Sequence, residues 1–209
     1  MKNNSLVWAV LWLILAPAAF AEKTAEAGLT PDPTKVVSAF HDALISAMKA
    51  SGYEERAAII GPAVDANFQL HTIARISLGR NWSPLDDTQQ ADFQNLIRAL
   101  ITSTYSSRFD NFDGQYFTVL DTTEMKRNRK RVKTTLTTKS ETVTLDYQLQ
   151  LIENEYRIYD IVANGVSDLS LKRANYAALF KSGGLDAVTE EISRHIADND
   201  SDHQSDTRR

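Results

Sequence analysis

The sequence predicts an α+β domain in which helices pack on one face of a twisted antiparallel sheet of about four strands. Apolar residues recur at helical spacing from residue 34 to about residue 104. Between residues 115 and 162 the spacing changes to a period of two, and helical spacing returns after residue 168. A block of helices, then strands, then helices is typical of helices layered on an antiparallel sheet.

The first 21 residues have the pattern of a secretory signal peptide. A basic residue, Lys2, precedes an apolar run over residues 6–15, and Ala19-Phe20-Ala21 matches a cleavage site. The apolar run is too short to span a bilayer. We therefore expect a signal peptide over residues 1–21, export to the periplasm, and a flexible leader over residues 22–33.

Capping and helix-breaking residues indicate where the first helices begin and end. Asp32 can cap a helix that begins at Pro33. A second, short helix is predicted over residues 53–60 and should end at Gly61-Pro62. A further helical segment is predicted over residues 64–78, so we expect the chain to be interrupted at the Gly-Pro pair.

The longest helix should follow Asp86. This residue and Gln89, three positions later, form the pattern of a capping box. The helix carries a continuous apolar stripe: Phe93, Leu96, Ile97, Leu100, Ile101 and Thr104.

The middle of the chain reads as a meander of strands. The candidates are residues 115–120, 131–138, 142–152 and 157–162. The third is the clearest, because Val143, Leu145, Tyr147, Leu149 and Leu151 alternate with polar residues. One face of each strand should therefore be buried and the other exposed, as in antiparallel sheets.

Two helices should close the fold. A turn at Asn164-Gly165 precedes the first, and Gly183-Gly184 should separate it from the second. The second helix presents one apolar face: Leu185, Val188, Ile192 and Ile196. Residues 34–197 are thus expected to form the domain, and the polar residues 198–209 a disordered tail.

The amino-acid composition excludes several classes of function for this protein. The 209 residues are 43% hydrophobic, enough for one domain with a real core. Cysteine is absent, which excludes thiol catalysis and thiolate metal sites. The formal net charge is −4, so nucleic acid is not an expected partner.

No residues point to catalysis. The four histidines, at positions 41, 71, 195 and 203, do not accompany a recognisable nucleophile or metalloprotease motif. Glycine is scarce and scattered, so no phosphate-binding loop is apparent. We predict no catalytic residues, no metal site and no cofactor.

A run of basic residues, which we call the basic run, crowds one predicted hairpin: Lys126, Arg127, Arg129, Lys130, Arg131 and Lys133. Charge on an exposed edge strand can prevent edge-to-edge pairing of sheets. The same charges could dock on an anionic membrane surface or an acidic partner. The pattern leaves both interpretations open; for docking, the candidates are Lys126, Arg127, Arg129, Lys130 and Arg131.

Several motifs resemble one protein family. They are Leu78-Gly79-Arg80-Asn81-Trp82, Gln89-Gln90, Thr104-Tyr105, Ile158-Tyr159-Asp160-Ile161, Gly165-Val166-Ser167, Asn175-Tyr176, Phe180 and Gly183-Gly184-Leu185. In this order and spacing the chain resembles the MlaC, or toluene-tolerance, family of periplasmic lipid-binding partners of ABC transport systems. The segment Tyr105-Ser106-Ser107-Arg108-Phe109 is closer to the hopanoid-associated HpnM branch.

The resemblance implies a pocket between sheet and helices that holds lipid tails as cargo. It implies a monomeric carrier of a phospholipid or hopanoid-type lipid, which serves a membrane-embedded ABC complex and an outer-membrane partner. The residues expected at the lipid are Leu96, Leu100, Ile101, Tyr105, Phe117, Val119, Val143, Leu145, Tyr147, Leu149, Ile158, Val166, Tyr176 and Phe180. One position departs from the family pattern, because Ala177 stands where members often carry arginine; Arg173 lies one helical turn earlier.

Two other functions fit the same residues. A lipid-modifying hydrolase would need a nucleophile that no motif supplies. A packed interaction domain without a ligand would show the same alternation, since pattern alone does not separate a packed core from a lined cavity.

Overall fold

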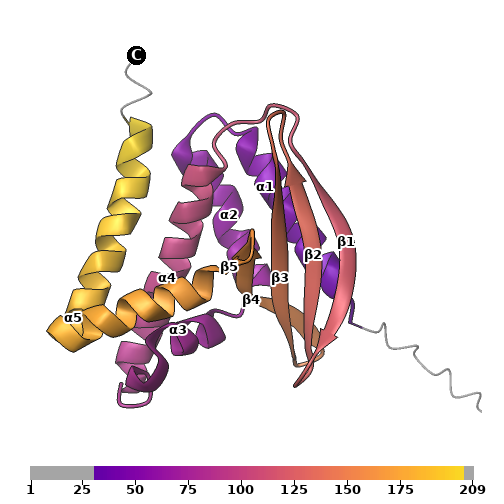
Figure 1. The fold of residues 1–209 in the computed structure, drawn as a ribbon. Coiled ribbons are helices and arrows are strands. Elements are labelled where there is room, and N and C mark those ends of the chain that lie inside the picture. The colour runs from indigo at the N-terminus through magenta and orange to yellow at the C-terminus, as the bar shows by residue number, and fades with distance from the viewer. Residues whose placement is uncertain (1–30, 205–209) are drawn as a thin grey trace, which may run out of the picture. The chain divides into compact units, whose positions relative to one another are not determined.

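The helices of the protein lie on one face of an open antiparallel sheet, as predicted (Figure 1). The sheet has five strands where about four were expected, because the short segment Val166–Ser167 also pairs with it. The computed structural model describes residues 31–204. The expected signal peptide and most of the expected leader lie outside the described residues.

Four α-helices precede the sheet within the described residues. They are α1 (Pro33–Met48), α2 (Tyr53–Asn67), α3 (Leu70–Leu78) and α4 (Asp87–Arg108), with the short 3-10 helix η1 (Gly79–Asn81) after α3. The Asp32 carboxylate accepts the Thr34 N–H at 2.9 Å and caps α1. The capping box of Asp86 and Gln89 is present at the start of α4. Both caps confirm the sequence prediction.

The prediction for α2 was wrong, because the helix continues through Gly61 and Pro62 to Asn67. Proline removes one N–H group, which would have bonded the carbonyl of Ala58. Both Ala58 and Pro62 are exposed, so water can satisfy that carbonyl. Gly61 is buried against α4, where an added Cβ would lie 3.3 Å from Arg98 Nη2. The helix ends instead at Phe68, whose backbone is extended.

The sheet has the strand order β1-β2-β3-β4-β5. The strands are β1 (Tyr116–Met125), β2 (Arg129–Thr137), β3 (Thr142–Ile152), β4 (Glu155–Ala163) and β5 (Val166–Ser167). The bounds of β3 are those predicted, whereas β1, β2 and β4 extend beyond the predicted ranges towards their turns. Arg127, Asn128, Glu153 and Asn154 have positive φ, so these two turns are tight.

The chain closes with α5 (Asp168–Gln204), which is broken at Gly183 and Gly184 as predicted. Gly184 has φ 69° and ψ −155°, a conformation nearly restricted to glycine. The break turns the second segment of α5 back along α4 (Figure 1). Val188 and Ile192 on this segment are buried, in agreement with the predicted apolar face.

The expected disorder from residue 198 was wrong as far as residue 204, because α5 extends to Gln204. Arg194 Nη1 lies 3.0 Å from Asp198 Oδ2, one helical turn away. Asn199 donates a hydrogen bond to the Ser103 hydroxyl of α4 at 3.1 Å. These contacts hold polar residues in the helix; residues 205–209 lie outside the described part.

Aromatic rings fill the space between α1, α4 and the sheet. Phe40 packs edge-on against Phe68 and Tyr105, with ring centroids 4.9 and 5.1 Å apart. The Gln69 N–H donates to the Ile158 carbonyl at 2.8 Å. This bond ties the α2–α3 connection to the edge of β4, so the helical layer is fixed on the sheet.

Candidate binding cavity

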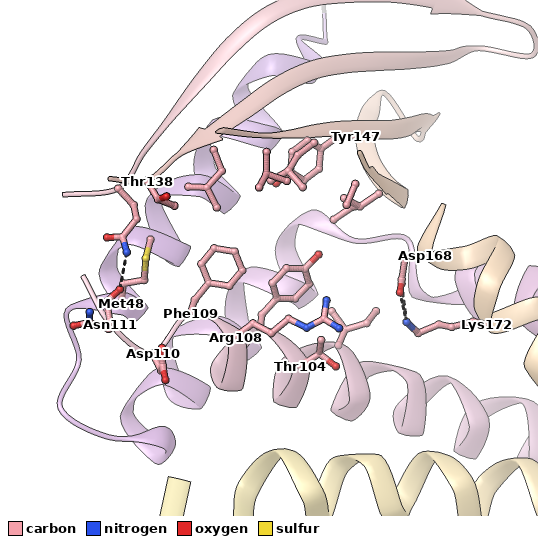
Figure 2. A pocket seen from close by; sticks show the side chains of 18 residues that line it. Met48, Thr104, Arg108, Phe109, Asp110, Asn111, Thr138, Tyr147, Asp168 and Lys172 are labelled. Carbon is pink, nitrogen blue, oxygen red and sulfur yellow. Dashed lines mark hydrogen bonds and ion pairs between the residues drawn. The ribbon is translucent and has the colours of Figure 1, made fainter. Parts of the chain in front are cut away.

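A cavity of about 510 Å³ lies between the inner face of the sheet and the C-terminal half of α4 (Figure 2). The sheet side is apolar: Leu136, Val143, Leu145, Tyr147, Ile161 and Ala163. The opposite wall comes from Ile101 and Tyr105 of α4 and from Phe109, which directly follows this helix, with Met48 from the end of α1. Its size is typical of ligand pockets, which are mostly apolar with a few polar groups.

Local periodicity explains both walls. Val143, Leu145 and Tyr147 are alternate residues of β3 and therefore share one face of the sheet. Ile101 and Tyr105 are four residues apart and share one face of α4, and Phe109 follows at the same interval as the C-cap of the helix. Figure 2 shows the rings of Tyr147 and Phe109 on opposite walls of the cavity.

Polar groups gather at the two ends of the cavity. At one end, Gln115 Nε2 donates to the Asn111 carbonyl at 3.2 Å, near Thr138. At the other end, Lys172 Nζ lies 2.6 Å from Asp168 Oδ1 and 2.7 Å from Oδ2. Arg108, at the end of α4, extends towards this ion pair (Figure 2). An amphiphilic ligand fits such a cavity, because its apolar part has apolar walls and its polar part has polar ends.

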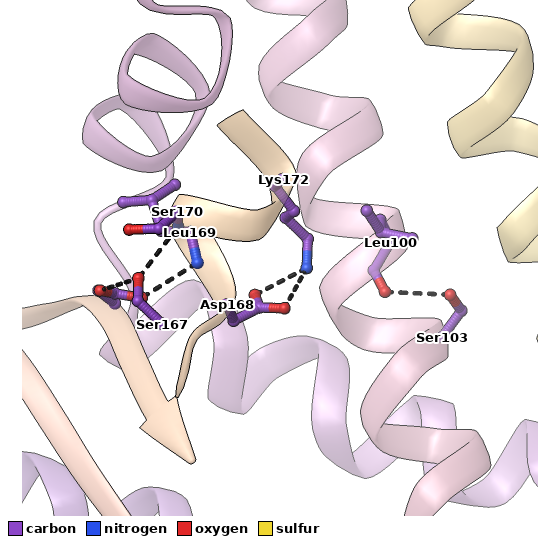
Figure 3. Close-up of polar contacts among 8 residues, drawn as sticks. Leu100, Ser103, Ser167, Asp168, Leu169, Ser170 and Lys172 are labelled. Carbon is purple, nitrogen blue, oxygen red and sulfur yellow. Dashed lines mark hydrogen bonds and ion pairs between the residues drawn. The ribbon is translucent and has the colours of Figure 1, made fainter. Parts of the chain in front are cut away.

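Asp160 fixes the position of the Asp168–Lys172 ion pair. Its carboxylate accepts the Ser167 hydroxyl at 2.7 Å and the Leu169 N–H at 3.1 Å. The Ser167 hydroxyl oxygen accepts the Ser170 N–H at 3.0 Å (Figure 3). Burial raises the pKa of Asp160, while these hydrogen bonds oppose the shift. The first turn of α5 is thereby anchored to β4.

A buried polar pair joins the sheet wall of the cavity to α1. His41 Nε2 lies 3.1 Å from the Tyr147 hydroxyl, and the Phe117 ring stacks on His41 with centroids 3.9 Å apart. Burial lowers the pKa of His41 to about 4 and raises the pKa of Tyr147 well above its usual value. Burial also raises the pKa of Tyr105. All three side chains are therefore neutral at pH 7.

A second cavity, of about 430 Å³, lies between α4 and the two segments of α5. It shares Thr104, Arg108, Asp168 and Lys172 with the first. Its remaining lining is Leu100, Leu171, Asn175, Tyr176, His195, Asp198 and Asn199. The two cavities are thus neighbours, the first mainly apolar and the second with more polar residues in its lining.

Of the fourteen residues expected at a lipid, half line these cavities. Ile101, Tyr105, Val143, Leu145 and Tyr147 line the first. Leu100 and Tyr176 line the second. The others line neither: Leu149 and Ile158 are fully buried in the core, Leu96, Phe117 and Phe180 pack on the core, and Val119 and Val166 are exposed.

The sequence prediction missed several lining residues. Phe109 and Arg108 continue the four-residue spacing from Tyr105 and Thr104, so extending the stripe to the helix end would have found them. Leu136 follows the alternation of β2. Met48, Asp168 and Lys172 carry no such signal, because only the tertiary fold brings α1 and α5 to the cavity.

Arg173, which lies one helical turn before Ala177, points away from both cavities. Its guanidinium packs over Gly79, where an added Cβ would be 3.4 Å from Nε. It lines neither cavity. The neighbouring Lys172 occupies the position beside both cavities.

The basic run occupies the β1–β2 hairpin, at the end of β2 away from the cavity, where Arg129 pairs with Gln150. The Arg129 guanidinium lies 4.8 Å from the centre of the Tyr159 ring, and Lys130 pairs with Glu124. Lys126, Arg127, Arg131 and Lys133 are exposed. These four are the members of the basic run that are available to a partner.

Within residues 31–204 no cluster of three or more histidine, aspartate or glutamate side chains could hold a metal ion. Among the helices that the structure describes, none combines the length and apolar character needed to cross a bilayer.

Comparison with known proteins identifies the family. A search of curated proteins found no match. The solved phospholipid-binding protein from Ralstonia solanacearum, in complex with a phospholipid, has the same fold with a TM-score of 0.72. The match covers 81% of this chain and 98% of that one, at 19% sequence identity. The family model described as MlaC protein matches residues 38–194. The chain therefore belongs to the MlaC family.

Proposed function

We propose that this protein binds a lipid in the cavity between the sheet and α4 and carries it as soluble cargo. The observation that carries the proposal is the apolar cavity itself, which has aliphatic and aromatic walls and polar ends. A packed interaction domain has no need of such a space. The likeness to a protein solved with a bound phospholipid supports the same assignment.

The physics of transfer explains why such a cavity is needed. Each methylene exposed to water costs about 0.8 kcal/mol. A diacyl lipid with about 30 methylenes would therefore cost roughly 24 kcal/mol, gross, to leave a bilayer unprotected. A carrier that encloses the tails removes most of this barrier, and no covalent step is required. We accordingly propose a carrier and not an enzyme, with the lipid as its only bound small molecule.

The family and the N-terminal sequence support a proposal for its setting. We propose that a cleaved signal peptide delivers the protein to the periplasm, where it acts as a monomer. It would exchange lipid with a membrane-embedded ABC complex and an outer-membrane partner. The Tyr105-to-Phe109 segment favours the HpnM branch, and hence a hopanoid-type lipid as an alternative to a phospholipid.

Mass spectrometry of purified protein tests the proposal. We expect about one intact lipid per protein molecule in solvent extracts, and its class distinguishes a phospholipid from a hopanoid. Recovery of hydrolysis products in place of intact lipid would favour a hydrolase. Lipid-stripped protein that takes up no lipid from phospholipid or hopanoid vesicles would overturn the carrier proposal.

A further inference from the structure

The boundary between the two cavities has the composition of a head-group site. Four residues belong to both linings: Thr104, Arg108, Asp168 and Lys172. On one side of them the walls are mainly aliphatic and aromatic. On the other side are the polar side chains of Asn175, His195, Asp198 and Asn199, together with Leu100, Leu171 and Tyr176. A molecule that lies across this boundary meets an apolar environment, then the charged boundary residues, then a mixed lining with more polar residues.

The two cations at the boundary come from different elements and have different environments. The Lys172 side chain is 19% exposed, and both oxygens of Asp168 bind its ammonium. Arg108 is exposed and forms no ion pair within the described residues. Its side chain extends towards the Lys172–Asp168 pair (Figure 2). A positive group without a counterion thus stands beside a second, partly neutralised one.

We propose that Arg108 and Lys172 hold the phosphate of a glycerophospholipid, whose acyl chains occupy the apolar cavity and whose head group enters the second cavity. This inference rests on the proposed function and adds to it a ligand class and two specificity residues. Guanidinium and ammonium groups are the usual protein partners of phosphate, and arginine can bind two of its oxygens at once.

The two residues should contribute unequally. Lys172 must share its ammonium between Asp168 and the phosphate, whereas Arg108 has no carboxylate partner to give up. A hydrogen bond to a charged group is stronger than one between neutral groups. We therefore expect removal of Arg108 to weaken phospholipid loading about fivefold, and removal of Lys172 to weaken it about twofold.

A lipid-loading assay can test the assignment. Lipid-stripped full-length protein is incubated with phosphatidylcholine vesicles that contain equal amounts of phosphatidylethanolamine and diacylglycerol, and the lipids bound per protein are quantified by mass spectrometry. The phosphate distinguishes the two kinds of lipid, since diacylglycerol has the same tails without it. We expect wild-type protein to load phospholipid about tenfold above diacylglycerol. In the double variant Arg108→Gln/Lys172→Gln, phospholipid loading should fall to the diacylglycerol level.

Two controls keep the result interpretable. Arg173→Gln removes a cation from the residue next to Lys172 that lines neither cavity, and it should leave loading unchanged. Diacylglycerol loading by the double variant should equal that of wild type, which shows that the tail cavity is intact. Equal phospholipid loading by wild type and double variant would overturn the head-group assignment while leaving lipid binding in place. A wild-type protein that loads no lipid would overturn the proposed function as well.

Free phosphate is the other possible source of the same chemistry. Calorimetric titration of lipid-stripped protein with inorganic phosphate should show no binding, because the tails are expected to supply most of the affinity. Phosphate binding that is lost in Arg108→Gln, together with phospholipid loading unaffected by the variant, would assign the boundary to a free anion and refute the proposal.

Discussion

Two leucines on the same face of β3 offer a matched test of the cavity. Leu149 is 0% exposed and belongs to the packed core. Leu145, four residues earlier on the same face, is half-buried and lines the apolar cavity. The strand, the side chain and the direction are the same, so a different response to substitution reports on the space in front of each residue.

The expected magnitudes differ severalfold. Leu149→Ala leaves a void in a packed core and should lower the free energy of unfolding by about 2–5 kcal/mol. Leu145→Ala enlarges a cavity that already exists, so only part of the transfer term is lost, about 1 kcal/mol. At about 2–4 °C per kcal/mol for a chain of this length, the two melting temperatures should be clearly separated.

Enlarging the side chains should again cost more stability at Leu149 than at Leu145. Leu149→Trp overpacks the core and should cost about 1–3 kcal/mol or more. Leu145→Trp has the cavity to fill, so the stability of lipid-stripped protein should change by less than about 1 kcal/mol. The indole then occupies space intended for acyl chains, and bound lipid per protein should fall.

Urea denaturation of lipid-stripped protein and mass spectrometry of bound lipid measure both effects. Equal destabilisation by Leu145→Ala and Leu149→Ala would show that the cavity is closed in solution and would refute the assignment of Leu145 to its wall. A Leu145→Trp variant that folds normally and binds as much lipid as wild type would refute the claim that acyl chains occupy this cavity.

Three further predictions concern other parts of the chain. Because burial lowers the pKa of His41 from 6.5 to about 4, the unfolded chain binds a proton in this interval that the folded chain does not. The free energy of unfolding should therefore fall by up to about 1.4 kcal/mol per pH unit as pH decreases from 6.5 to 4. Urea denaturation should show that this free energy depends less steeply on pH in His41→Gln. The exposed control His71→Gln should keep the wild-type pH dependence. Gly184→Ala places a side chain at φ 69° and should lower the free energy of unfolding by about 1–3 kcal/mol, measured by thermal denaturation. Gly52→Ala has open space at the new Cβ and should lower it less. Equal losses of stability in the two variants would contradict the role of Gly184 in the break of α5. The double variant Arg127→Glu/Arg131→Glu should sediment less with anionic vesicles at low salt. The difference should nearly vanish in about 0.5 M salt, because exposed charges are already screened over about 10 Å at 0.1 M. Unchanged binding at low salt would leave protection of the sheet edge as the only role of the basic run.

Local chemistry predicted most of the secondary structure. The caps at Asp32 and Asp86, the alternation of β3 and the break at Gly183-Gly184 each depend on a few neighbouring residues, and each is found in the structure. The errors arose where distant contacts outweigh local preference. Gly61 and Pro62 remain helical because α2 packs on α4, and Asp198 and Asn199 remain helical because of Arg194 and Ser103.

The sequence by itself determined which faces of the helices and strands are apolar, because that follows from a period of two or 3.6 residues. It did not determine which apolar residues pack on each other and which border a cavity. Leu145 and Leu149 have the same pattern, yet one borders the cavity and the other is in the core. The ion pair of Asp168 and Lys172 reaches the cavity only because Asp160 anchors the start of α5 to β4. Cavities arise from the fit between elements far apart in the chain, and only the tertiary structure decides that fit.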